Sequence, residues 1–257
     1  MKAIWTGSIG FGLVNIPIKL YSAVQSSNLD FDMLDKKDGA NIKFQRVNEH
    51  THKEVLWKNI VKGYLLNEKY VVLEDADFKK AAPEKSAHIE IIQFVKQAEI
   101  ESIYFESPYY IKPEKTGTRA YVLLKEALEK SGKAGIGTFV MRDREHVCMI
   151  AVISGLLILN RLRFPEEIRK PDELELPTAK SKPTEVKLAV SLIEQLTKPF
   201  NPKLFKDEYT GRLLKIIKSK ARGKSVPYQP LKVVHSKTKD LMEQLQASLS
   251  KGKRKVS

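Results

Sequence analysis

Three apolar stretches in close succession, at residues 136–141, 147–153 and 156–164, constrain the fold of this chain most strongly. They are joined by two short links, residues 142–146 and the pair Ser154-Gly155. Apolar runs of this length between turn residues predict an antiparallel meander of strands. The middle strands are apolar on both faces, and this pattern favours a covered sheet or a closed barrel over an open sheet with one wet face.

Other segments predict further strands and one helix. Residues 14–20 alternate apolar and polar side chains, which is typical of a half-buried strand. Pro17 lies inside this strand and cannot donate to a ladder, so we expect the strand at a sheet edge or at a bulge. Residues 70–73 and 89–95 predict two more strands. Residues 118–130 predict a helix, because the apolar side chains fall on one face and Ser131-Gly132 follows.

The C-terminal part of the chain has a different pattern. After a proline-containing connection, residues 186–196 and 213–217 carry apolar side chains at helical spacing. Residues 221–235 contain one glycine and two prolines and predict a linker. Residues 237–249 predict a short helix, and its apolar stripe consists of Leu241, Met242, Leu245 and Leu249. A helix this short is marginal alone, so we expect the stripe to pack on the protein itself or on a partner.

The charge of the chain is unevenly distributed. The 257 residues include 45 Lys and Arg against 31 Asp and Glu, a net charge of +14. Residues 211–257 alone contribute +11, and the first 210 residues are nearly neutral. Such a surplus predicts a polyanionic partner, either nucleic acid or an anionic membrane surface. The chain closes with a basic tail that contains Lys251, Lys253, Arg254 and Lys255.

Sequence motifs of enzymes and metal sites are missing. The chain has no phosphate-binding loop, no dinucleotide fingerprint and no nucleophile elbow around Ser8. Its single cysteine, Cys148, lies in an apolar strand and cannot form a disulfide framework or a cysteine zinc site. His50 and His52 are too few for a metal site. No apolar run is long enough for a membrane span, and the start does not resemble a signal peptide. We therefore expect a cytosolic protein without enzymatic activity, cofactor or metal.

Several blocks of the sequence, in order, resemble the prokaryotic Ku family. The opening Ile4-Trp5 and the run at residues 11–21 carry its signature, and further matching blocks lie at residues 60–64, 69–73, 94–95, 99–100, 107–110, 120–128, 188–220 and 240–249. The resemblance covers nearly the whole chain. Thr6 and Leu65 depart from the lysine and glutamate usual there. Asn48 and Thr51 replace a Cys-x-x-Cys pair of some relatives, which puts a zinc knuckle in doubt.

The resemblance implies an α+β fold, with a Ku-type β-barrel core, an inserted extended bridge, a helical C-terminal arm and a basic tail. The expected domains are the barrel at residues 1–180, with the bridge at about 35–58, the arm at 181–222, and the linker, short helix and tail at 223–257. It also implies a homodimeric ring around double-stranded DNA ends in non-homologous end joining. Such a ring recruits an ATP-dependent DNA ligase of the ligase D type.

Basic residues suited to a DNA backbone lie in two places. Six fall in the extended stretch between Leu34 and Ile60, and two lie at the link between the first two meander strands: Lys36, Lys37, Lys43, Arg46, Lys53 and Lys58, then Arg142 and Arg144. Phosphate charges recur about every 1.7 Å along a duplex axis, so cations spread along extended backbone suit them. Nothing resembles a recognition helix, which favours binding independent of sequence.

Two rival functions stay open. A general architectural DNA- or RNA-binding protein would act through the basic tail and use the barrel as a scaffold. A nuclease would need a cluster of carboxylates around a metal ion. The aromatic residues Trp5, Phe11, Tyr109, Tyr110 and Tyr121 are expected in the core, whereas a binder of single strands needs exposed stacking platforms. We expect the protein in the cytoplasm, associated with the nucleoid.

Overall fold

The computed structural model describes residues 1–81, 87–224 and 245. The chain divides into two compact units. One comprises Met1–Ser26 with Asp30–Lys170, and the other Ser27–Leu29 with Pro171–Ser257.

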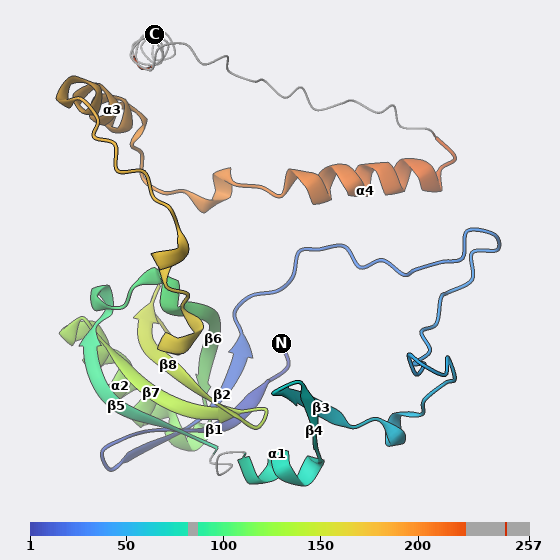
Figure 1. The fold of residues 1–257 in the computed structure, drawn as a ribbon. Coiled ribbons are helices and arrows are strands. Elements are labelled where there is room, and N and C mark those ends of the chain that lie inside the picture. Colours follow the sequence, from blue (N-terminus) through green and yellow to red (C-terminus); the bar gives the residue numbers. More distant parts are fainter. Residues whose placement is uncertain (82–86, 225–244, 246–257) are drawn as a thin grey trace. The chain divides into compact units, whose positions relative to one another are not determined.

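The first unit contains a closed barrel of seven strands (Figure 1). Around the barrel the strands run in the order β1-β2-β6-β9-β8-β7-β5. Their bounds are β1 Trp5–Phe11, β2 Val14–Ser22, β5 His88–Lys96, β6 Phe105–Pro113, β7 Lys133–Met141, β8 Arg144–Ile153 and β9 Leu156–Leu162. All neighbours are antiparallel except β1 and β5, whose parallel pairing closes the barrel. The predicted meander is confirmed as β7, β8 and β9.

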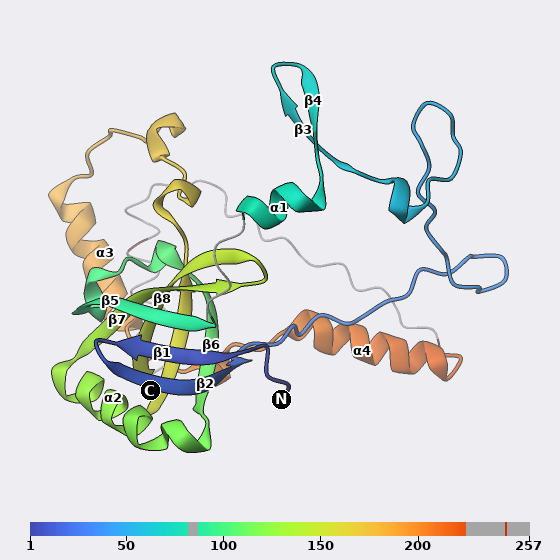
Figure 2. The same cartoon turned by 90° about the horizontal axis from the view of Figure 1, so that it is seen from below.

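The barrel interior forms the main core, because alternate residues of each strand point inward. Ile16, Ile18 and Leu20 of β2 are fully buried there. Helix α2 (Thr118–Ser131) packs Leu124 and Leu128 against the same core (Figure 2). Gly132, with a φ of 63°, ends this helix in the left-handed conformation. The predicted helix and its stop are thus confirmed.

A second, smaller core lies on the outer face of the meander. Met149 and Ala151 of β8 are buried there beside Ala134 of β7. Ile100 and Tyr104, from the segment with the 3-10 turns η2 (Gln97–Glu99) and η3 (Ser102–Tyr104), pack against them. This segment covers the outer face of β8, which explains why the strand is apolar on both sides.

The position of Pro17 corrects one expectation. The strand that contains it is β2, which pairs with β1 on one side and β6 on the other, so it is not at an edge, and no bulge interrupts its pairing. The ladder with β6 begins at Ile18. The Pro17 carbonyl accepts a hydrogen bond from the Glu114 amide at 2.9 Å, just beyond the end of β6. Pro17 therefore lies just outside the ladder between β2 and β6, and its lack of an N–H group removes no hydrogen bond from that ladder.

Most of the aromatic residues expected in the core are found there. Tyr109 is buried, and Trp5, Phe11 and Tyr121 pack against the main core. The Trp5 indole N–H donates to the Val140 carbonyl at 2.9 Å, which links β1 to β7.

Between β2 and β5 the chain leaves the barrel for residues 23–87. We call this stretch the insertion. It contains the 3-10 turn η1 (Trp57–Asn59), the two-stranded sheet of β3 (Lys62–Leu66) and β4 (Lys69–Leu73), and helix α1 (Asp75–Ala81). Two isolated bridges, Leu34 with Asn41 and Val47 with Glu54, close small loops within it. Its described residues contribute nothing to the two cores.

After the barrel, short 3-10 turns η5 (Pro165–Glu167) and η6 (Pro171–Glu173) lead into the second unit. Its described part contains α3 (Pro183–Leu196), the turn η7 (Pro202–Leu204) and α4 (Glu208–Ala221), at the two places where the sequence predicts helices. Asp207 caps α4 by accepting a hydrogen bond from the Thr210 amide at 3.0 Å. Among the residues described, no helix combines the length and apolar composition that crossing a bilayer requires.

Candidate nucleic-acid interface

The six basic residues predicted from the extended stretch all lie in the insertion and are exposed. Lys36 and Lys37 sit in a turn in which Asp35 accepts hydrogen bonds from the amides of Lys37 and Gly39. Lys43 and Arg46 lie between the two small loops, Lys53 lies in the second loop, and Lys58 lies in η1. None of the six forms an ion pair with another described residue. Their charge is therefore available to an external anion.

Arg46 contacts an aromatic ring of the insertion. Its guanidinium lies 4.6 Å from the centre of the Trp57 ring, a cation–π contact. Its carbonyl accepts a hydrogen bond from the Val55 amide at 2.8 Å. The contact orients the guanidinium without neutralising it, which leaves it able to meet a phosphate.

Arg142 and Arg144 lie at the tip of the hairpin between β7 and β8, where the sequence places them. Arg142 and Asp143 have φ values of 52° and 65°, as a tight hairpin turn requires. In the turn between β8 and β9, Ser154 and Gly155 have the corresponding positive φ values of 52° and 75°. An L-residue in this left-handed region costs about 1–2 kcal/mol, and glycine avoids the cost. Ser154 has the same φ of 52° as Arg142, so both turns place an L-residue in this region.

Both arginines line a cavity of about 550 Å³ whose other lining residues include Glu106, His146 and Arg161. The Arg161 Nε donates to Glu106 Oε2 at 2.6 Å, and this hydrogen bond lowers the pKa of the Glu106 carboxyl. Arg161 is thus already paired with a carboxylate. Burial, followed by the charge of Arg161, lowers the pKa of His146 and keeps its ring neutral near pH 7. Arg142 and Arg144 are the cations of this cavity that have no ion-pair partner among the described residues.

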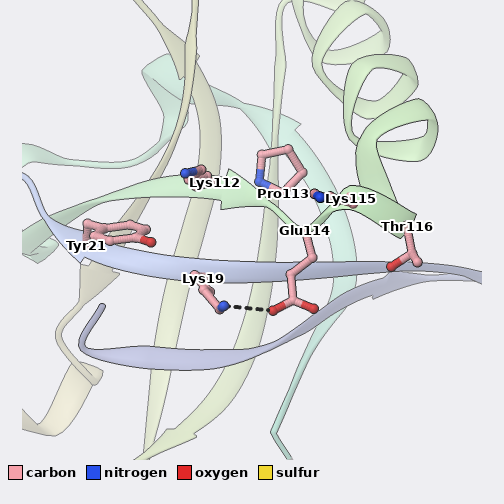
Figure 3. Close-up of a pocket in the computed structure, with 7 residues that line it drawn as sticks. All are labelled: Lys19, Tyr21, Lys112, Pro113, Glu114, Lys115 and Thr116. Carbon is pink, nitrogen blue, oxygen red and sulfur yellow. Dashed lines mark ion pairs between the residues drawn. The ribbon is translucent and has the colours of Figure 1, made fainter. Parts of the chain in front are cut away.

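Besides the insertion and the cavity at Arg142 and Arg144, the structure shows a further basic surface that was not predicted from the sequence. It is a pocket of about 420 Å³ on the outside of the barrel, lined by Lys19, Tyr21, Lys112, Pro113, Glu114, Lys115 and Thr116 (Figure 3). We call it the lysine pocket. Lys19 and Tyr21 come from β2, Lys112 from β6, and Lys115 from the turn η4 (Lys115–Gly117) before α2. Lys19 alternates with buried Ile18 and Leu20, so its outward direction could have been predicted; its neighbours could not.

The tail residues fall mostly outside the described residues. This holds for Leu241, Met242, Leu249, Lys251, Lys253, Arg254 and Lys255. Leu245 is described and is helical. The assignment of the stripe and of the basic tail therefore stays a prediction.

The described part of the chain shows no cluster of metal ligands beside these surfaces. Within residues 1–81 and 87–224, no group of three His, Cys, Asp or Glu side chains is placed to hold a metal ion. His50 and His52 are exposed in a loop of the insertion. Cys148 is buried in the barrel, and burial raises the pKa of its thiol to about 12, so it is not a thiolate nucleophile at neutral pH.

The fold and these surfaces define a class of protein: a closed β-barrel that carries a long, exposed insertion with unpaired cations. Comparison with known proteins then identifies the family. Residues 10–190 match the family model described as the Ku70/Ku80 beta-barrel domain. The chain belongs to the Ku family, and the resemblance found in its sequence is confirmed, as is the α+β fold with a barrel core.

Relatives in three organisms illustrate the match, and each is named "Non-homologous end joining protein Ku". The relative from Coxiella burnetii is 36% identical over 257 residues, which cover 96% of this chain and 94% of the relative. The one from Opitutus terrae is 38% identical, covering 97% and 92%. The one from Archaeoglobus fulgidus is 39% identical, covering 97% and 98%.

Proposed function

We propose that this protein binds the ends of double-stranded DNA as a homodimeric ring in non-homologous end joining, without reading base sequence. The relatives carry that pathway in their name. The observation that carries the proposal is the insertion, where six exposed cations have no acidic partner among the described residues. Contacts of this kind bind phosphates and hold no information on base identity.

The exposed apolar side chains of the insertion support a second copy as partner. Phe44, Trp57, Tyr64 and Tyr70 are each 64–78% exposed. Large exposed apolar surface in a soluble chain marks an interaction site. A lone two-stranded sheet such as β3 with β4 is marginal in water, so it needs a surface to pack on. Two insertions that pack on each other would bury this surface and close a ring.

Recruitment of an ATP-dependent ligase D completes the proposal, with the protein as a non-enzymatic scaffold on the nucleoid in the cytoplasm. Its support is the predicted apolar stripe of the tail. Leu241→Asp with Leu245→Asp should reduce ligase stimulation more than DNA binding, because the basic tail stays intact. Joining assays and mobility shifts on the same preparations measure the two effects. Normal stimulation by this variant would move the ligase site to residues 184–220.

Competition between linear and closed circular duplex in a mobility-shift assay tests end binding. A ring that loads at ends should be displaced by unlabelled linear duplex and not by an equal mass of closed circle. Circles relinearised by a restriction enzyme are the matched control, since their sequence is identical. Equal competition by circles would favour the rival function, a general DNA- or RNA-binding protein that acts through its basic tail.

A further inference from the structure

The lysine pocket brings several positive charges together on the outer surface of the barrel. Lys19 of β2 lies directly opposite Lys112 of β6 in the antiparallel register, and Lys115 lines the same pocket. Like charges at opposed positions destabilise a sheet. Glu114 compensates one of them, with its Oε1 3.1 Å from the Lys19 Nζ (Figure 3). Lys112 and Lys115 are exposed and form no ion pair with a described residue.

We propose that Lys19, Lys112 and Lys115 form a phosphate-binding surface on the barrel that contacts the backbone of the DNA duplex. This inference rests on the DNA binding proposed above and adds a contact region that lies outside the insertion. A row of phosphates relieves the repulsion that the barrel alone leaves uncompensated. The arrangement therefore suits a polyanion better than a neutral ligand.

The remaining lining of the pocket favours phosphates over bases. Tyr21 and Thr116 contribute hydroxyl groups, which can donate hydrogen bonds to phosphate oxygens. The pocket is formed by two strands and a 3-10 turn, so no helix is available to enter a groove. Binding at this surface should thus be the same for every duplex sequence.

The barrel offers a matched control. Lys96 and Lys133 also lie opposite each other, at the ends of β5 and β7, and neither lines the lysine pocket. Lys133 shares a small pocket with one acid, Glu129. Replacement of this pair removes the same amount of positive charge from the barrel at a different place. A comparison of the two variants therefore separates the loss of a local contact from a general loss of net charge.

The test measures binding of the full-length protein to linear duplex over a series of salt concentrations. Lys112→Gln with Lys115→Gln should weaken binding and flatten the slope of log K against log [salt] by about 3.6, because the proposed homodimer loses two phosphate contacts in each subunit and each contact accounts for about 0.9. Lys96→Gln with Lys133→Gln should keep the wild-type slope. Duplexes of two unrelated sequences should give the same result.

A stability measurement excludes a merely structural explanation. Lys112→Glu places an acid opposite Lys19, so the Tm of the variant should equal or exceed that of the wild type while DNA binding falls. A variant that bound less because it was damaged would instead melt earlier.

Two outcomes would overturn the inference, and a third would reject the function on which it rests. Unchanged affinity and slope in Lys112→Gln with Lys115→Gln would show that the surface does not contact DNA. Another anion, such as an acidic peptide, would then be the candidate ligand. An equal loss of affinity in Lys96→Gln with Lys133→Gln would show that the weaker binding comes from the lower net charge alone. Failure of the wild type to prefer linear duplex would instead reject the proposed function itself, and that failure is distinguishable because it does not depend on any lysine variant.

Discussion

The barrel and the insertion are built from similar fractions of apolar residues but use them in opposite ways. Phe139 of the barrel is 1% exposed and Ile150 is fully buried. In the insertion, Trp57 is 72% exposed and Tyr70 is 74% exposed. The barrel satisfies its own apolar surface and its backbone, since every strand has two neighbours. The insertion leaves its large aromatic side chains exposed, so we expect its stability to depend on what it binds.

Truncation in the barrel core should give the largest effect. Phe139→Ala removes a ring that packs edge-on against Trp5, with 5.9 Å between ring centres, and leaves a cavity. We expect a loss of about 3–5 kcal/mol in the free energy of unfolding. Urea unfolding followed by tryptophan fluorescence measures it. A loss below about 1 kcal/mol would mean that the barrel interior is not tightly packed.

The same kind of truncation in the insertion should act on assembly. Trp57→Ala removes exposed aromatic surface and the support of Arg46, so the dimer should weaken by about 2 kcal/mol, in the range of an interface hot spot. The Tm of the monomeric barrel should not change. Sedimentation over a range of concentrations gives the dimer constant. An unchanged constant would remove the dimer contact from this part of the insertion.

Charge reversal in the insertion should act on DNA alone. Lys43→Glu with Arg46→Glu should weaken binding about tenfold or more for every duplex sequence, because phosphate contacts are lost. Far-UV circular dichroism and sedimentation confirm the fold and the dimer. Unchanged binding would make Arg142 and Arg144 the better candidates for the main contacts.

Arg142 combines an unfavourable backbone conformation with a predicted DNA contact, so its replacement should affect stability and binding in opposite directions. Arg142→Gly should raise the free energy of unfolding by up to about 1 kcal/mol, because glycine adopts a φ of 52° without strain. DNA binding should fall at the same time. A destabilised variant with normal DNA binding would show that the arginine serves the turn and not a ligand.

The smallest effect concerns acid stability. Arg161 lowers the pKa of Glu106, so the pair stabilises the barrel above the ordinary glutamate pKa of 4.5 and loses this contribution as the pH falls through the lowered value. The contribution is about 1 kcal/mol or less, since both side chains are partly exposed. Wild type and Glu106→Gln should differ in unfolding free energy at pH 6.5, and the difference should shrink as the pH falls below 4.5. If the difference in unfolding free energy did not change with pH, the substitution would act through packing and not through the charge of Glu106.

Local patterns in the sequence were sufficient for much of the fold. The apolar runs of β7, β8 and β9 and the helical spacing of α2, α3 and α4 predict these elements, because periodicity within a dozen residues decides which face is buried. The exposed cations of the insertion were also predictable, since they lie in a stretch with little apolar alternation. The Ku resemblance supplied the barrel type, which no local pattern specifies.

Only the tertiary structure decided how distant segments meet. Pro17 is tolerated in an interior strand because β6 ends at Pro113, opposite Ile18, and a strand does not encode where its neighbour stops. Lys19 and Lys112 are each ordinary surface lysines along the chain, and only strand register places them opposite each other. Register depends on the whole closed barrel, because every strand must match two neighbours at once.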